Sequence, residues 1–226
     1  MATVGRPRHA SSLRRILSGI LRSLSTLALC ALAAVPAPTL AQSTSRPPSV
    51  PVLTRGVLLV AHPSLLDPNF QRTVVLVCEH GAGGTLGIII NRPTALLLSE
   101  ALPNVSILKG TSYVLFAGGP VQPGTVLMLF RVVETPDQLP EIMEHVYLGL
   151  NRKVLERVIT KPNPTETFRA YAGYAGWAPG QLEFEMAMGS WAVVQADPSS
   201  IFDKQSGTLW DEMTEALQAP RVIRLE

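Results

Sequence analysis

Three adjacent residues of the 226-residue sequence, Cys78-Glu79-His80, place a thiol, a carboxylate and an imidazole next to one another. Because alternate residues of a strand point to the same face, Cys78 and His80 would share a face and Glu79 would oppose them. Such a Cys–His pair is the nucleophile and base of a hydrolase or transferase. In the competing interpretation, Cys78 packs inside as a small hydrophobic residue and His80 begins a turn.

A second group, Asn91-Arg92-Pro93-Thr94, contains residue types that can bind an anion. An arginine fixed at a strand end by a following proline offers a rigid fork of N–H donors to a carboxylate or phosphate. Gly118-Gly119, after another apolar run, could expose backbone N–H groups to the same ligand. We therefore predict a small anion-binding pocket. Its predicted lining is Asp67, Arg72, Asn91, Arg92, Gly119, Trp177 and Gln181.

The alternative for this second group is purely structural. Arg92 would then form an ion pair with Asp67 or Glu79, and the glycines would only permit turns. Trp177 would close the edge of the core instead of lining a pocket wall.

Other common chemistries have no motif in the sequence. There is no GxxxxGK[ST], no GxGxxG between a strand and a helix, and no HExxH, CxxC or GxSxG. Three of the four histidines, His62, His80 and His145, are dispersed, and the fourth lies near the N-terminus, so no metal-ligand spacing exists. We therefore predict no metal and no cofactor, and a non-enzymatic regulatory or ligand-binding domain is favoured over an enzyme.

The charge of the chain is unevenly distributed. Five of the 19 Lys and Arg residues lie in residues 1–41, which contain no acidic residue, so the rest has 14 basic against 17 acidic residues. A slightly acidic domain has no general electrostatic attraction to DNA. We expect the partner to be a small anionic ligand or a protein, and direct nucleic-acid binding is disfavoured.

Residues 1–41 have the order of an export signal: an arginine-rich start, an uncharged run over 24–35, and small residues up to Ala41. That run of about 12 residues is shorter than the roughly 20 that span a bilayer, which predicts a cleavable signal and a periplasmic protein without a transmembrane anchor. The alternatives are a transit peptide, or a start site assigned too far upstream in a cytoplasmic protein. Residues 42–52 form a predicted Pro/Ser-rich linker, 53–218 the folded domain and 219–226 a tail.

Short apolar runs bounded by turn residues predict strands, and 3.6-residue periodicity predicts helices. The predicted strands are 56–61, 73–79, 86–91, 113–117, 125–133, 146–150, 168–173 and 191–196. The predicted helices are 95–102, one capped by Asn151, one beginning at Pro179, and 209–217. Most of the first five strands have no helix between them, which favours an α+β fold with a mixed, largely antiparallel sheet.

The chain resembles the YqgE/AlgH family over about residues 53–213. The resemblance rests on HPSLLDPNFQRTVVLVCEHGAGGTLGIIINRPT, FAGGPV, GYAGWAPGQLEFEM and SWAVVQADPSSIFD. It implies a single α+β domain with a bifurcated, barrel-like mixed sheet surrounded by helices. Family members are uncharacterised bacterial proteins, usually cytoplasmic and beginning near the equivalent of Leu53, and some carry a transcriptional-regulator label. The resemblance therefore implies no catalytic residues and adds regulation of transcription as a further interpretation.

Overall fold

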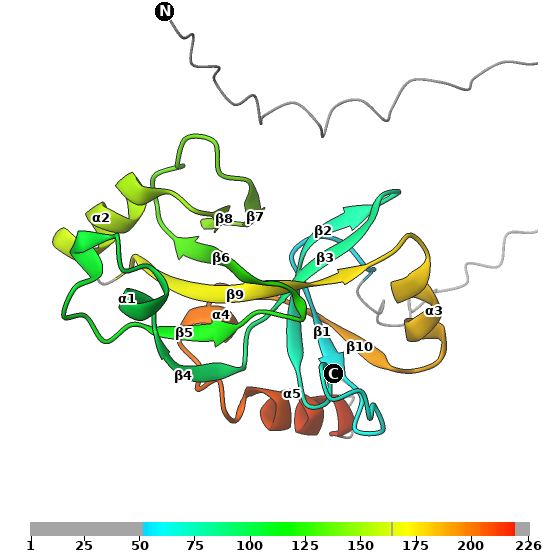
Figure 1. The fold of residues 1–226 in the computed structure, drawn as a ribbon. Coiled ribbons are helices and arrows are strands. Elements are labelled where there is room, and N and C mark those ends of the chain that lie inside the picture. Colours follow the sequence, from blue (N-terminus) through cyan, green and yellow to red (C-terminus); the bar gives the residue numbers. More distant parts are fainter. Residues whose placement is uncertain (1–51, 164, 220–226) are drawn as a thin grey trace, which may run out of the picture. The chain divides into compact units, whose positions relative to one another are not determined.

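A computed structural model of the protein describes residues 52–163 and 165–219. Within these ranges the chain forms ten strands and five α-helices, and most strand pairs are antiparallel (Figure 1). The predicted α+β class with a mixed, largely antiparallel sheet is therefore confirmed. The predicted export signal, and nearly all of the predicted linker and of the predicted tail, lie outside the described residues. No helix within the described ranges is both long and apolar enough to cross a membrane.

One half of the sheet is built from three apolar runs at the start of the domain and one strand near its end. Its strands, in spatial order, are β10 (Trp191–Gln195), β1 (Val57–Ala61), β2 (Val74–Gly81) and β3 (Gly84–Ile89). All neighbours in this half are antiparallel. The β1 residues are all buried, which explains why that strand is a continuous apolar run without alternation.

The other half is built from strands in the middle of the chain. They are β6 (Val121–Arg131), β8 (Val146–Gly149), β7 (Glu141–Met143), β5 (Val114–Ala117) and β4 (Pro93–Leu97). β6 pairs with β8, and β8 pairs with β7 in a short hairpin. β4 and β5 form a separate antiparallel pair.

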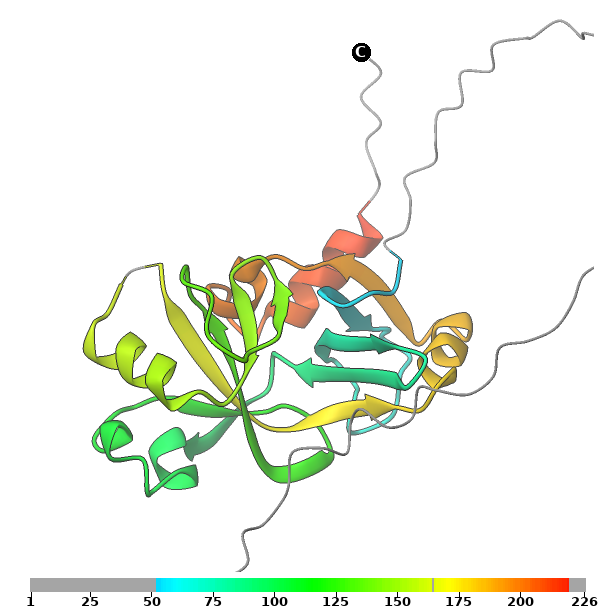
Figure 2. The same ribbon diagram turned by 90° about the horizontal axis from the view of Figure 1, so that it is seen from above.

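β9 (Thr167–Trp177) joins the two halves (Figures 1 and 2). Its last residues pair with β3, while its earlier residues pair with β6 and also lie parallel to β5. The sheet is thus bifurcated at β9, as the family resemblance implies. The strand path ends at β10 and β7 without closing, so the sheet is open and the implied barrel is incomplete.

The two faces of β9 belong to two hydrophobic cores, because successive side chains of a strand point to opposite faces. Tyr171 and Trp177 lie in the core of the β1–β3 half, whereas Phe168 and Ala170 lie in the other. The first core is also covered by α3 (Gln181–Ala187), α4 (Pro198–Phe202) and α5 (Leu209–Gln218). The second is covered by α1 (Leu98–Ala101), α2 (Arg152–Thr160) and the 3-10 helix Ser106–Leu108.

The structure contains each of the eight predicted strands. Most ends shift by one or two residues, but β6 begins at Val121 instead of 125 and β9 continues to Trp177 instead of 173. The predicted cap of α2 is also present, since the Asn151 side chain accepts a hydrogen bond from the Val154 N–H at 3.2 Å. β4, β7, α4 and the 3-10 helix were not predicted.

Two predictions about helices were wrong in part, one at residues 95–102 and one at Pro179. The expected helix 95–102 is wrong in its first turn: residues 95–97 belong to strand β4, and only Leu98–Ala101 form a helix, α1. Pairing with β5 and the 2.6 Å hydrogen bond from Thr94 Oγ1 to the Leu115 carbonyl override local helix propensity there. Pro179 does not begin a helix. Gly180 precedes α3 with a φ of +78°, a conformation that glycine adopts without strain, and the helix begins at Gln181.

Candidate functional site

The predicted pocket residues Asp67, Arg72, Asn91 and Arg92 do lie near one another, around residues 62–72, which we call the polar loop. This loop connects β1 to β2 and is mostly exposed. Hydrogen bonds within the loop stabilise its conformation. Asp67 Oδ1 accepts a hydrogen bond from the Asn69 N–H at 2.8 Å. The Asp67 carbonyl also accepts from the N–H groups of the next turn.

Arg92 holds the polar loop from the end of β3. Its Nη1 donates to the Asn69 carbonyl at 2.7 Å, and its Nη2 donates to the carbonyls of Gln71 at 3.0 Å and Pro68 at 3.2 Å. Burial lowers the pKa of the Arg92 guanidinium, and the charge of nearby Asp67 opposes that shift. The donors that sequence reasoning assigned to an anion are thus directed at loop carbonyls, and this arrangement also differs from the alternative ion pair.

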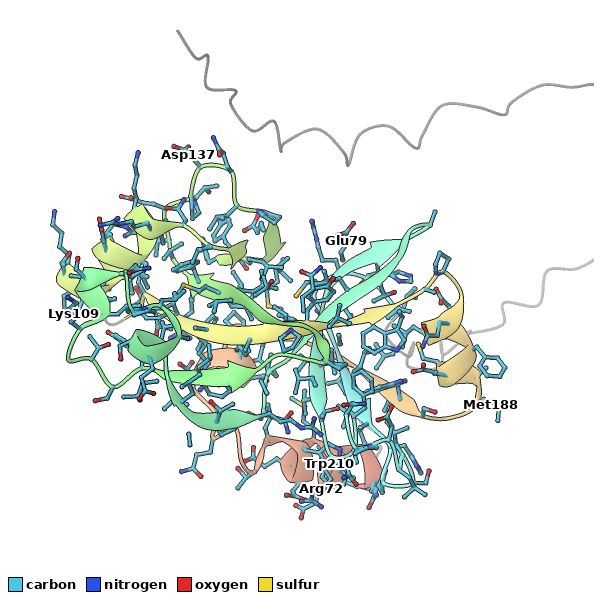
Figure 3. The ribbon with its side chains drawn as sticks, viewed as in Figure 1. Arg72, Glu79, Lys109, Asp137, Met188 and Trp210 are labelled. Atoms are coloured by element: carbon cyan, nitrogen blue, oxygen red, sulfur yellow. The ribbon has the colours of Figure 1, made fainter. Side chains whose placement is uncertain are left out.

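Asn91 and Arg72 complete the attachment of the loop. The buried Asn91 amide accepts from the Val74 N–H at 2.8 Å and donates to the Arg72 carbonyl at 3.0 Å. The Arg72 guanidinium lies 4.3 Å from the Trp210 ring and donates at 2.8 Å to both carboxylate oxygens of Asp211 on α5. Figure 3 shows Arg72 and Trp210 beside each other at α5.

The remaining predicted pocket residues fix other backbone segments. A Cβ at Gly119 would overlap the backbone of Tyr174, so only glycine fits where this segment crosses β9.

Trp177 and Gln181 belong to a hydrogen-bond network around Glu185. The indole N–H groups of Trp177 and Trp191 donate to one oxygen of Glu185, at 3.0 and 2.8 Å, and Gln181 donates to the other at 3.0 Å. This network attaches α3 to the sheet.

The Cys78–His80 pair lacks the features of a catalytic dyad. Cys78 is buried at a bulge in β2, and burial raises the pKa of its thiol far above the ordinary value. A buried neutral thiol is a poor nucleophile. His80 Nδ1 instead shares a hydrogen bond of 2.8 Å with Thr85 Oγ1, and its Nε2 lies 3.8 Å from Glu183. Within the described ranges, no group of three His, Cys, Asp or Glu residues could hold a metal ion.

A cleft of about 680 Å³ lies on one side of the β7–β8 hairpin, between it and the β10–α4 connection. We call it the hairpin cleft. Most of its wall is apolar, with Val132, Met143 and Ala196 among the lining residues. The other lining residues are Arg131, Val133, Glu144, His145, Thr165, Gln195, Asp197 and Pro198. The cleft therefore has the size and the apolar lining typical of small-molecule sites.

Arg131, at one edge of the hairpin cleft, already has ionic partners. Its Nη1 and Nη2 donate to the two carboxylate oxygens of Asp203 at 2.8 and 3.0 Å, and its Nε donates to the Thr165 carbonyl at 3.2 Å. The hydrogen bond from Arg131 lowers the pKa of the Asp203 carboxyl. The Arg131 guanidinium is thus fixed in the wall of the cleft by its own partners, and it is not available to bind an anionic ligand.

Asp197 is occupied in the same way, because it caps α4. Its carboxylate accepts from the Ser200 N–H at 2.9 Å and from the hydroxyls of Ser199 and Ser200 at 2.6 and 2.7 Å. Burial alone would raise the pKa of Asp197, but these hydrogen bonds outweigh it and the pKa is lowered. The carboxylate therefore stays charged, and its oxygens are used to cap the N-terminus of α4.

Glu144 and His145, in the turn of the β7–β8 hairpin, are the more available polar groups of the cleft. His145 has a φ of +61°, a left-handed conformation that is rare for a residue with a side chain. Its N–H is held by Glu141 Oε1 at 3.1 Å, and its Nε2 lies 3.8 Å from the exposed Glu144 carboxylate. The sequence analysis noted His145 only as an isolated histidine, because the short strand β7 that places it in a hairpin turn was not predicted.

A smaller cavity of about 350 Å³ lies on the other side of the same hairpin, against β2. Cys78, Glu79 and His80 line it together with residues of the hairpin, and Figure 3 shows Glu79 on the part of β2 near that hairpin. The structure thus brings Cys78 and His80 to one cavity, though without a hydrogen bond between them among those found in the described residues.

Comparisons with known proteins agree on one family. A family model described as AlgH-like matches residues 58–221. A UPF0301 protein of Streptomyces avermitilis is 37% identical over 163 residues, which cover 70% of this chain and 83% of the relative. Another from Myxococcus xanthus is 37% identical over 157 residues, covering 68% and 85%.

Solved structures show the same fold. The solution structure of the AlgH protein from Pseudomonas aeruginosa superposes with a TM-score of 0.62 at 28% identity and covers 76% of this chain and 93% of that protein. A crystal structure from Corynebacterium diphtheriae gives a TM-score of 0.63 at 23% identity, with 77% and 91% covered. The sequence match across the folded domain, together with this shared fold, shows that the chain belongs to the AlgH-like family.

Proposed function

We propose that this AlgH-like chain is a non-enzymatic domain that binds a small, largely apolar molecule in the hairpin cleft. One observation carries the proposal: a cavity of about 680 Å³ with a mostly apolar wall lies between the end of β10 and the β7–β8 hairpin, which belong to different halves of the sheet. Ligand sites in proteins usually measure about 300–1,000 Å³ and combine apolar walls with a few polar groups.

The charged groups of the cleft favour a neutral or weakly polar ligand over an anion. Arg131 and Asp197 are already hydrogen-bonded within the protein, and Glu144 adds an exposed carboxylate. A ligand would bury its apolar body against Val133 and Met143 and place a hydrogen-bonding group near the hairpin turn. The anionic ligand expected from Arg92 remains a separate prediction, and the three carbonyl partners of that guanidinium do not favour it.

A hydrolase or transferase using Cys78 with His80 is the less favoured alternative. Burial of the thiol and the engagement of His80 with Thr85 both oppose it. Native protein treated with iodoacetamide near neutral pH should stay unmodified at Cys78 until it is unfolded. Rapid alkylation of the folded protein would instead support the enzyme.

Val133 allows a direct test, because it lines the cleft while being 58% exposed, so that a larger side chain is accommodated without overpacking the core. We expect N-phenyl-1-naphthylamine, a neutral apolar dye, to increase in fluorescence with the wild-type protein. Val133→Trp should weaken dye binding at least about tenfold, a loss of about 1.4 kcal/mol.

The matched control is Leu150→Trp, since Leu150 is equally exposed but does not line the cleft. This control should bind the dye as the wild type does, and both variants should unfold at wild-type temperatures. Equal dye binding by all three proteins, or no binding by any of them, would contradict the proposal.

A further inference from the structure

Two large apolar side chains, one on the outward side of α3 and one at its C-cap, have no place in either core. Phe184 is 68% exposed and Met188 is 71% exposed. They lie one turn apart, because the Met188 N–H donates to the Phe184 carbonyl. Glu183 and Ala187 are exposed between and beside them, and we call these four residues the α3 face. Figure 3 shows Met188 pointing away from the sheet.

The exposure of these side chains does not come from a loosely attached helix. Leu182 on the inner side of α3 is fully buried, and Glu185 accepts from both indoles and from the Gln181 amide. The Glu185 carbonyl also accepts from the Ser190 N–H at 2.9 Å. The fold therefore holds Phe184 and Met188 at the surface on a fixed support.

The surroundings of the α3 face are acidic. The β2–β3 hairpin lies against the start of α3, since a Cβ at Gly84 would overlap the Trp177 carbonyl and His80 Nε2 lies 3.8 Å from Glu183. Neither residues 73–91, which contain this hairpin, nor residues 170–203, which contain α3, include a Lys or Arg. They do contribute two carboxylates on α3: that of Glu183, which is exposed, and that of Glu185, whose hydrogen-bond donors within the described residues are all neutral.

We propose that the α3 face is a docking site for a protein segment that presents apolar side chains flanked by Lys or Arg, as a basic amphipathic helix does. Burial of Phe184 and Met188 supplies the attraction, and methionine adapts its shape to different apolar partners. The carboxylates of Glu183 and Glu185 select for the basic flanks. The site shares no residue with the hairpin cleft, so it stands or falls independently of the proposed function.

The acidic surroundings also decide against two other occupants. In a symmetric contact between two copies, Glu183 of each α3 face would lie close to its counterpart and repel it. An anionic lipid surface would be repelled by Glu183 and Glu185 in the same way.

The test uses a fluorescein-labelled amphipathic peptide of Leu and Lys and a second peptide in which Glu replaces every Lys. Fluorescence anisotropy should show binding of the Leu/Lys peptide to the whole protein, weakening as salt is added, and at least tenfold weaker binding of the Leu/Glu peptide. Phe184→Ser combined with Met188→Ser should weaken binding of the Leu/Lys peptide at least tenfold. Glu183→Gln should weaken it less and reduce the salt dependence.

Leu96→Ser combined with Leu150→Ser is the matched control, because both leucines are exposed but lie outside the α3 face. This pair should leave peptide binding unchanged, and circular dichroism should show that every variant is folded. Absence of Leu/Lys binding, equal binding of the Leu/Glu peptide, or loss of binding in the control pair alone would overturn the proposal. So would dissociation of a dimer by the Phe184→Ser/Met188→Ser variant, or binding to phosphatidylglycerol vesicles that requires the same two residues.

Discussion

The polar loop and the hairpin cleft lie in different parts of the structure and use their polar residues in opposite ways. In the polar loop, the carbonyls of Pro68, Asn69 and Gln71 occupy the Arg92 guanidinium, and each end of the Asn91 amide has a backbone partner. In the hairpin cleft, mostly apolar side chains surround an open volume of about 680 Å³. Polar residues that stand out in a sequence can thus be those that the fold needs most.

The difference follows from what each segment must do for the backbone. An exposed loop of eleven residues has carbonyl groups that no strand can satisfy, and a fixed arginine can satisfy several of them at once. The cleft needs no such support, because regular hydrogen bonds of the β6, β7 and β8 strands hold its walls. Variants of the predicted pocket residues should therefore reduce stability without affecting the cleft.

The largest effect is expected for Gly119→Ala. The new Cβ would overlap the backbone of Tyr174 in the strand that joins the two halves, and backbone atoms cannot move aside as side chains can. We expect a loss of about 3 kcal/mol in the free energy of unfolding, measured by urea denaturation. Gly124→Ala is the control, since a Cβ there meets no atom within 4 Å. Equal stability of the two variants would show that the crossing at β9 tolerates a side chain.

Asn91→Ala should have the next largest effect. It leaves the buried Val74 N–H and the Arg72 carbonyl without their partner, which we expect to cost about 2 kcal/mol. Binding of the apolar dye by the folded variant should equal that of the wild type. A variant of normal stability that had lost an anionic ligand would instead restore the pocket predicted from the sequence.

Arg92→Ala should cost somewhat less, about 1–2 kcal/mol, because water can reach part of the loop and replace some of the lost hydrogen bonds. Arg92→Lys should fall between the alanine variant and the wild type, since an ammonium group cannot reproduce the planar fork that reaches three carbonyls. Thermal unfolding measures both. Proteolysis should also cut the loop faster in the alanine variant, and unchanged cleavage would argue that Arg92 does not hold it.

The smallest effect concerns the ion pair at the edge of the cleft. Because Arg131 lowers the pKa of Asp203 in the folded protein, the unfolded chain takes up this proton first as the pH falls below about 3.9. The stabilisation is therefore complete above that pH and is lost as the pH falls through the lowered folded pKa. With Asp203 about half exposed, we expect a contribution below about 1 kcal/mol.

Arg131→Gln should remove this pH-dependent component while leaving the cleft volume nearly unchanged. Chemical unfolding between pH 2 and pH 6 compares the two proteins. Identical pH profiles would mean that the pair adds nothing to stability.

The sequence predicted the fold class because β1, β2 and β3 are short apolar runs between turn residues. The secondary-structure prediction failed where pairing between distant strands overrode the helix propensity of the local sequence. Residues 95–102 contain good helix formers, yet β5 recruits the first of them into β4. Glu141–Met143 is too short and too polar to be recognised, and it becomes β7 only because β8 lies beside it.

The candidate site was less predictable than the fold. The sequence could identify Arg92 and Asn91 as special, and both do have defined partners, but residue types do not reveal whether a partner is a ligand or the protein's own backbone. Val132, Met143 and Ala196 carry no such signal, since they are ordinary apolar residues. Their meeting in one cavity depends on the open sheet and on the turn at His145, which follow from long-range pairing.

The position of β9 in the chain has a consequence for how the protein is made. β3, β5 and β6 are all synthesised before Thr167–Trp177, yet each takes β9 as a neighbour. During translation their edges therefore stay unpaired until Trp177 has left the ribosome, and β1 must wait longer still for β10. Exposed strand edges of this kind attract other chains, so the growing polypeptide is most exposed to aggregation, and most dependent on chaperones, just before its last third emerges.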